Sequence, residues 1–102
     1  MKLPEEYVRY LADNGLKEGG LTVEPGWFQL WPPDEVGKWN QDYHVEESAP
    51  GFLGFGSNGG GEMLAFDIEG HVVMIPFIGM SASDVRLVAG SWKEFTERIE
   101  IS

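Results

Sequence analysis

The chain has 102 residues, of which 42% are hydrophobic and 13% aromatic, so it can build one modest core and does not have the composition of a disordered chain. It contains no cysteine, which excludes disulfides and thiolate metal sites and fits a reducing, cytoplasmic setting. Seventeen acidic residues against seven basic ones give a net charge of −10, which argues against nucleic acid and anionic membranes as partners.

The first half of the chain predicts two helices and two strands. Residues 4–14 should form a helix, because a proline occupies its first position, two glutamates follow, and a glycine comes directly after it. A short strand is expected at 21–23 and a tryptophan-rich strand at 27–31, with a Pro-Gly turn between them. Apolar residues at helical spacing predict a second helix at 34–43, and 46–51 is expected to be a loop.

The second half of the chain predicts four strands and a last helix. The strands are expected at 52–56, 63–67, 71–75 and 85–89, and the first two flank a Ser-Asn-Gly-Gly-Gly hairpin loop. A Ser-Trp-Lys-Glu capping box should open a helix at 91–101.

Consecutive strands joined by short turns pair antiparallel, and helices that do not alternate with strands indicate an α+β fold. We therefore expect residues 1–102 to form a single α+β domain, with an antiparallel sheet flanked by an N-terminal and a C-terminal helix. The longest apolar stretch, 72–80, is interrupted by a proline and a glycine and is far short of the roughly 20 residues that a membrane helix needs. No secretory signal is expected either, since no apolar run follows the first lysine.

The glycine-rich segment after residue 53 matches the G-x-G-x-x-G pattern of dinucleotide-binding loops. That pattern requires a helix after the glycines, because the helix N-terminus holds the pyrophosphate. Here an apolar stretch typical of a strand follows, so a hairpin loop whose glycines adopt positive φ is the better interpretation. The residues of this hairpin are Asn58, Gly59, Gly60, Gly61 and Glu62.

Asn58, Glu62, Asp67 and His71 are close in sequence and could in principle hold a divalent cation. They match neither an EF-hand loop nor a His-x-x-x-His pattern, so we expect neither a metal nor a cofactor, and Asp67 should order the following turn. His44 and His71 are the only histidines, and neither lies beside a plausible nucleophile. We therefore predict no catalytic residues and no enzymatic activity.

The acidic charge is concentrated in the middle of the chain. No lysine or arginine occurs between Trp39 and Val85, a span that holds seven carboxylates. Such a surface attracts a basic protein and speeds their encounter, although solubility alone is an alternative explanation. Trp39 lies among these acidic residues, where an aromatic anchor with an acidic rim would suit a protein interface; packing against the sheet is the alternative. The candidate partner-binding residues are Asp34, Glu35, Trp39, Asp42, Glu46 and Glu47.

The chain resembles the SUKH superfamily, the Smi/Knr type of cell-wall-regulator-like domain. Residues 3–11 are similar to the family's Leu-Pro-x-x-Tyr-x-x-Phe-Leu opening, and the Asn-Gly at 14–15 is similar to the one that follows it. Residues 55–67 look like the glycine-rich hairpin and the acidic residue beyond it. The strand end at 76–80 and the final helix at 91–95 also match, with tryptophan where phenylalanine is commoner.

Two departures from the family pattern are visible. Many members carry another helix before the Leu-Pro motif, and we expect none here because only two residues precede that motif; residues 31–50 follow no pattern that we can match.

The resemblance implies an α+β domain with an antiparallel sheet flanked by helices, and no catalytic residue set. Many bacterial members are immunity proteins that neutralise toxins, often nucleases, whereas others are regulatory or scaffolding proteins. Our first hypothesis is therefore a cytoplasmic, non-catalytic binder that covers the basic active face of a toxin domain. The alternatives are a regulatory or adaptor module and a small-ligand sensor with a pocket under the glycine-rich hairpin. An enzyme is the third interpretation, since seventeen carboxylates could still supply an acid–base pair.

Overall fold

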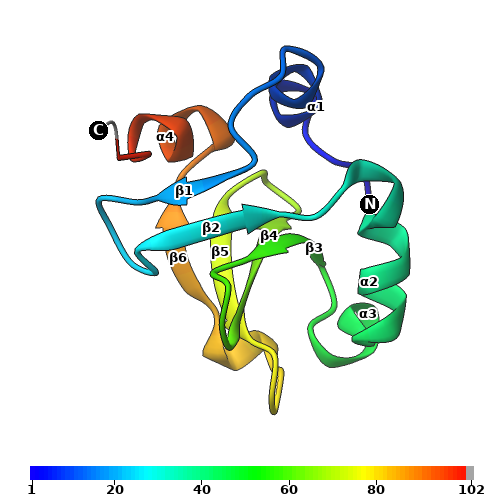
Figure 1. Cartoon of the computed structure of the whole chain (residues 1–102). Coiled ribbons are helices and arrows are strands. Elements are labelled where there is room, and N and C mark those ends of the chain that lie inside the picture. The colour runs from blue at the N-terminus through cyan, green and yellow to red at the C-terminus, as the bar shows by residue number, and fades with distance from the viewer. Residues whose placement is uncertain (101–102) are drawn as a thin grey trace.

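A computed structural model describes residues 1–100, in which six strands form one curled antiparallel sheet (Figure 1). The strands follow one another in the sheet in chain order, so each pairs with its neighbours in the sequence. Their bounds are β1 Glu18–Gly20, β2 Trp27–Leu30, β3 Phe52–Ser57, β4 Glu62–Asp67, β5 Val72–Pro76 and β6 Arg86–Ala89.

Helices pack on the two opposite faces of this sheet. The N-terminal and C-terminal helices lie together at one end of the molecule, and a helical segment between β2 and β3 lies along another side (Figure 1). The helices are α1 Glu5–Ala12, α2 Val36–Asp42, α3 Val45–Ser48 and α4 Trp92–Glu97, with short 3₁₀ turns η1 Pro33–Glu35 and η2 Ala82–Asp84.

The first face of the sheet carries an aromatic core that is closed by α1 and α4. Tyr7 of α1 is fully buried, with its ring centroid 5.1 Å from Phe55, 5.2 Å from Phe66 and 4.6 Å from Trp92. Burial raises the pKa of the Tyr7 phenol well above its ordinary value, with a smaller contribution from neighbouring Tyr10. Edge-to-face and stacked rings of this kind add to the free energy of simple burial.

The two terminal helices are joined by hydrogen bonds at the start of α4. Ser91 caps this helix as predicted, its Oγ accepting from the Glu94 backbone N–H at 3.1 Å, while the Glu94 carboxylate pairs with Arg98 at 2.6 Å. A glutamate of α1 adds a second cap, because the Glu6 Oε1 accepts from the backbone N–H groups of Trp92 at 2.9 Å and Lys93 at 3.3 Å. These bonds fix α1 against α4 over the first core.

The second face carries a smaller core that is covered by α3. Residues alternate along the central strands, so that Met63 and Ala65 point to this face while their neighbours point to the first. Val45 and Ala49, four residues apart, are buried against them. Each central strand is thus buried on both faces, which explains its continuous run of apolar residues.

The predicted α+β fold, with an antiparallel sheet flanked by N- and C-terminal helices, is confirmed. The strand expected at 21–23 was wrong, because the strand that pairs with β2 is the Glu-Gly-Gly stretch of β1, whose glycines carry no strand signal. The loop expected at 46–51 was wrong for residues 46–48: α2 ends at Asp42, and the left-handed His44 (φ 54°) precedes a further short helix, α3. The last helix ends at Glu97, short of the predicted 101, which lies outside the described residues.

Candidate functional site

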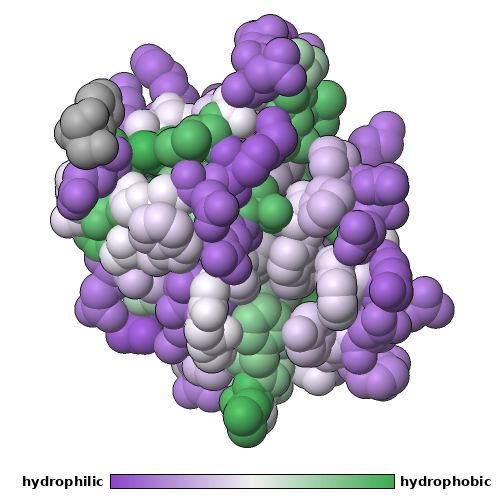
Figure 2. Space-filling model, in the orientation of Figure 1, coloured by the Kyte–Doolittle hydropathy of each residue, from purple (hydrophilic) through white to green (hydrophobic). Residues whose placement is uncertain are grey.

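The predicted partner-binding residues lie on one segment of the chain, residues 33–48, which forms η1, α2 and α3 one after another. We call it the acidic helical segment, because it holds five carboxylates and one lysine. Figure 2 shows hydrophilic side chains along the outer side of this part of the molecule. Of the predicted set, Asp34, Asp42, Glu46 and Glu47 are exposed, whereas Glu35 and Trp39 are half-buried.

Trp39 is held in place by its neighbours on the segment. Its indole N–H donates to the Glu35 carboxylate at 3.2 Å, and its ring lies 5.9 Å from the ring of Tyr43 and 6.1 Å from that of Trp31. The Lys38 ammonium lies 5.0 Å from the Trp39 ring centroid, within cation–π distance. The ring therefore packs on the residue that follows β2 and also keeps part of its surface in solvent.

The aromatic row continues to a loop that sequence reasoning did not single out. The Tyr43 ring lies 4.6 Å from Phe77, and the next residue, Ile78, exposes 92% of its surface. Figure 2 shows hydrophobic surface at this end of the molecule, where the loop between β5 and η2 projects (Figure 1). The available signal was an apolar run between the strands predicted at 71–75 and 85–89, where a polar connection is usual.

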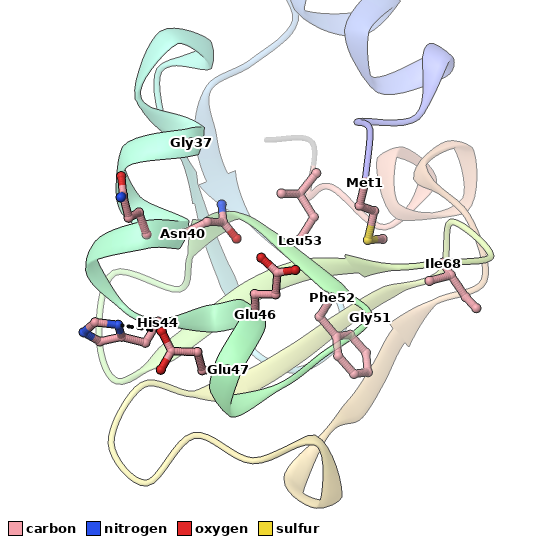
Figure 3. Close-up of a pocket in the computed structure, with 11 residues that line it drawn as sticks. Met1, Gly37, Asn40, His44, Glu46, Glu47, Gly51, Phe52, Leu53 and Ile68 are labelled. Carbon is pink, nitrogen blue, oxygen red and sulfur yellow. Dashed lines mark ion pairs between the residues drawn. The ribbon is translucent and has the colours of Figure 1, made fainter.

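A groove of about 750 Å³ lies between the acidic helical segment, the start of β3, the N-terminus and the β4–β5 turn (Figure 3). Its size falls within the range of ligand-binding pockets. None of the glycine-rich hairpin residues lines it, so it is not the pocket expected under that hairpin. Polar lining comes mainly from α2 and α3, and apolar lining from Met1, Phe52, Leu53 and Ile68.

The Asn40 side chain fixes α2 to the sheet beside this groove. Its amide nitrogen donates to the Gly54 carbonyl at 2.8 Å and to the Val36 carbonyl at 2.7 Å, and its oxygen accepts from the Gly54 N–H at 2.7 Å. The pairing of β2 with β3 ends before it reaches Gly54: Leu30 pairs with Gly56, and the Trp31 N–H then donates to the Phe55 carbonyl. Gly54 therefore takes its partners from Asn40 instead of from β2. One side-chain amide thus replaces a missing strand neighbour.

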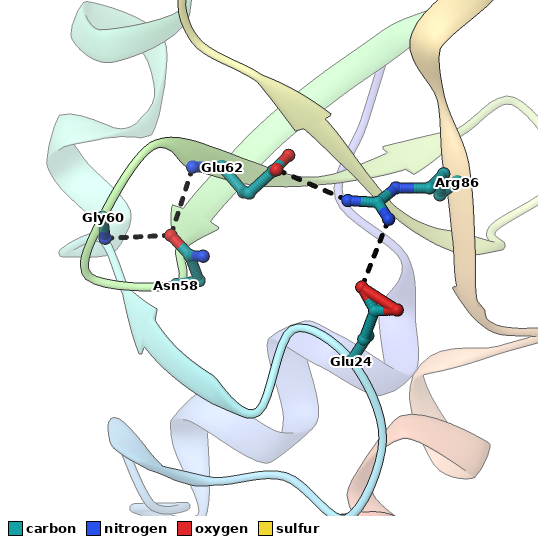
Figure 4. A network of polar contacts seen from close by, with 5 residues as sticks. All are labelled: Glu24, Asn58, Gly60, Glu62 and Arg86. Atoms are coloured by element: carbon teal, nitrogen blue, oxygen red, sulfur yellow. Dashed lines mark hydrogen bonds and ion pairs between the residues drawn. The ribbon is translucent and has the colours of Figure 1, made fainter.

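The predicted glycine-rich hairpin forms between β3 and β4 and is ordered by its own side chains. The Asn58 Oδ1 accepts from the backbone N–H groups of Gly60 at 2.9 Å and Glu62 at 3.1 Å (Figure 4). Arg86 on β6 then bridges Glu62 at 3.4 Å and Glu24 of the β1–β2 loop at 3.2 Å. The polar groups of the hairpin therefore order its own turn and link it, through Arg86, to the β1–β2 loop. A binding role for them stays a prediction.

Asp67 and His71 form a second polar pair, at the opposite end of β4 from Asn58 and Glu62. The His71 Nδ1 lies 2.7 Å from the Asp67 carboxylate, which also accepts the backbone N–H groups of Glu69 and His71. Burial raises the pKa of Asp67, but these hydrogen bonds outweigh it and hold that pKa below its ordinary value. The hydrogen bond to Asp67 raises the pKa of His71.

The four residues considered for a cation therefore separate into two pairs. Within residues 1–100, no three histidine or carboxylate side chains come together as a metal site would require. The same part of the chain contains no helix that is long and apolar enough to span a membrane.

Together these features define a small α+β domain in which an acidic, partly aromatic helical layer covers one face of a meandering sheet. The sequence matches the model of the SMI1 / KNR4 family (SUKH-1) over residues 1–98, and the chain belongs to this family. This confirms the resemblance drawn from the sequence motifs. The match includes residues 31–50, for which motif comparison found no pattern. A search of curated protein sequences found no match.

Proposed function

We propose that this protein is a non-catalytic, immunity-type binder that acts in the cytoplasm on a basic toxin domain. The observation that carries the proposal is the acidic helical segment, where five carboxylates and one lysine surround a half-buried aromatic row. Membership of the SMI1 / KNR4 family supports this role, because many of its bacterial members are immunity proteins.

The mechanism follows from charge and packing. A toxin that cleaves nucleic acid binds phosphates with lysine and arginine, so its active face is basic. The carboxylates of the segment attract that face over long range and raise the association rate. Trp39 and Tyr43 then offer partly exposed aromatic surface of the kind that slows dissociation. Covering the active face denies it to substrate, and neither a metal nor a cofactor is needed.

The partner is first identified by affinity capture from the protein's own host, with the neighbouring gene products co-expressed. One stoichiometric basic partner that is lost as salt rises, and is toxic when freed, would support the immunity role. Several substoichiometric partners would instead support an adaptor or regulatory module, which is the alternative function of this family.

The contact face is then tested by stopped-flow association with the purified partner. The test variant neutralises the segment with Asp34→Asn, Glu35→Gln, Asp42→Asn, Glu46→Gln and Glu47→Gln. The control removes as much charge elsewhere, with Asp13→Asn, Glu18→Gln, Glu69→Gln, Glu97→Gln and Glu100→Gln.

We expect the first variant to associate at least about tenfold more slowly at low salt, with a flatter salt dependence, and the control to change little. Equal slowing in both variants would show that only net charge matters, and unchanged kinetics in the first would contradict the proposed face.

A further inference from the structure

The groove beside the acidic helical segment has two chemically different parts. Its apolar lining is accessible, because Met1 exposes 59% and Ile68 78% of their surface. Its rim carries the carboxylates of Glu46 and Glu47, and Figure 3 shows Glu46 directed toward the middle of the groove. A ligand that fills it must therefore combine an apolar body with a positive end.

The wall formed by α2 is kept open by a glycine. Gly37 lies within this helix, where glycine costs about 1 kcal/mol relative to alanine. A Cβ placed there would meet no atom within 4 Å, and its φ is not in the left-handed region, so neither packing nor backbone geometry requires glycine. The missing side chain leaves space on the groove side.

We propose that this groove receives an extended segment of the basic partner that carries an arginine next to an aliphatic residue. The inference rests on the proposed function and specifies which partner chemistry its acidic face takes. The arginine stem would lie on Leu53 and Ile68, and its guanidinium would meet the Glu46 and Glu47 carboxylates.

Both carboxylates suit a planar guanidinium. Among the residues that the structure describes, Glu46 makes no ion pair, and the Glu47 carboxylate has only the His44 Nδ1, at 3.4 Å, as an ion-pair partner. Arginine fits better than lysine, because its five donors can bond two oxygens at once and its weakly hydrated head loses less on leaving water. Long cationic side chains also bury their stems on apolar surface while the charge stays at the rim.

The probe is the peptide acetyl-Gly-Arg-Leu-Gly-amide, titrated into the ¹⁵N-labelled protein by NMR. Its matched control carries citrulline, a neutral isostere, in place of arginine. We expect shifts confined to the groove, at Gly37, Gln41, Glu46 and Leu53, and at least tenfold weaker binding of the citrulline peptide.

Gly37→Leu is the blocking variant, with Gly37→Ala as its matched control. We expect Gly37→Leu to abolish the shifts and Gly37→Ala to preserve them, since a methyl group leaves the groove largely open. Absence of binding, equal binding of both peptides, or shifts that persist in Gly37→Leu would overturn the proposal.

This test is separate from that of the proposed function. If neutralising the segment slows partner association but Gly37→Leu leaves partner affinity unchanged, the acidic face is the interface and the groove inference fails alone. If neutralisation has no effect, the proposed function itself fails at this face, whatever the peptide does.

Discussion

Asn40 offers the sharpest test of how the acidic helical segment is attached to the sheet. Asn40→Ala removes three hydrogen bonds and leaves the N–H and C=O of buried Gly54 without partners. Each unsatisfied buried group costs about 1–3 kcal/mol, so we expect the free energy of unfolding to fall by about 2–4 kcal/mol. Urea denaturation followed by tryptophan fluorescence measures this loss, and hydrogen exchange should speed up at the Gly54 amide.

The control is Gln41→Ala on the next residue of the same helix, which is exposed and should change stability by no more than about 0.5 kcal/mol. Asn40→Asp tests the direction of the pH dependence. Its carboxylate would face the Gly54 and Val36 carbonyl oxygens and can donate to neither until it is protonated. That variant should therefore gain stability relative to wild type as pH falls through its carboxyl pKa. If Asn40→Ala proved no more harmful than Gln41→Ala, the amide would not be what attaches α2.

Four further outcomes follow from the structure. Gly56→Ala should cost about 2 kcal/mol or more in urea denaturation, because its Cβ would collide with the Gln29 carbonyl oxygen, whereas Gly37→Ala should gain about 1 kcal/mol. In an NMR titration, Asp67→Asn should lower the pKa of the His71 ring toward its ordinary value; a ring pKa that did not move would contradict the pairing. The stabilisation from the Asp67–His71 pair should be fully present between the ordinary pKa values of Asp and His, roughly pH 4 to 6.5. It should be lost as pH rises through the raised pKa of His71, and also as pH falls through the lowered pKa of Asp67.

The sheet and its terminal helices could be predicted because the residue pattern of each element matches the way that element is buried in the fold. The central strands are buried on both faces and read as apolar runs, and the Ser91 cap marks the start of α4. The short strand β1 was not predicted, because two of its three residues are glycine, which is rare in strands. It is extended because it pairs with β2. Likewise, α3 depends on a left-handed His44 and on burial of Val45, neither of which sequence spacing reveals.

The candidate site was only partly visible in the sequence. Clustered carboxylates indicated the acidic helical segment, since charge is read directly from the residues. The groove and the exposed Ile78 depend on how distant elements meet: Met1 and Ile68 approach α3 only in the folded chain. The hydrogen bonds between Asn40 and Gly54 span 14 residues and follow no motif.

The acidic helical segment occupies a connection that the sheet itself does not need. β2 and β3 are antiparallel neighbours, which a two-residue turn can join, yet residues 31–51 separate them. The segment thus lies within an enlarged hairpin loop, which Val45, Ala49 and the Asn40 amide anchor to the sheet. The residues that pair β2 with β3 lie outside the segment. Its outward residues can diverge in charge and shape while those anchors stay fixed. The surface of this connection can therefore change without changing how the strands of the sheet pair.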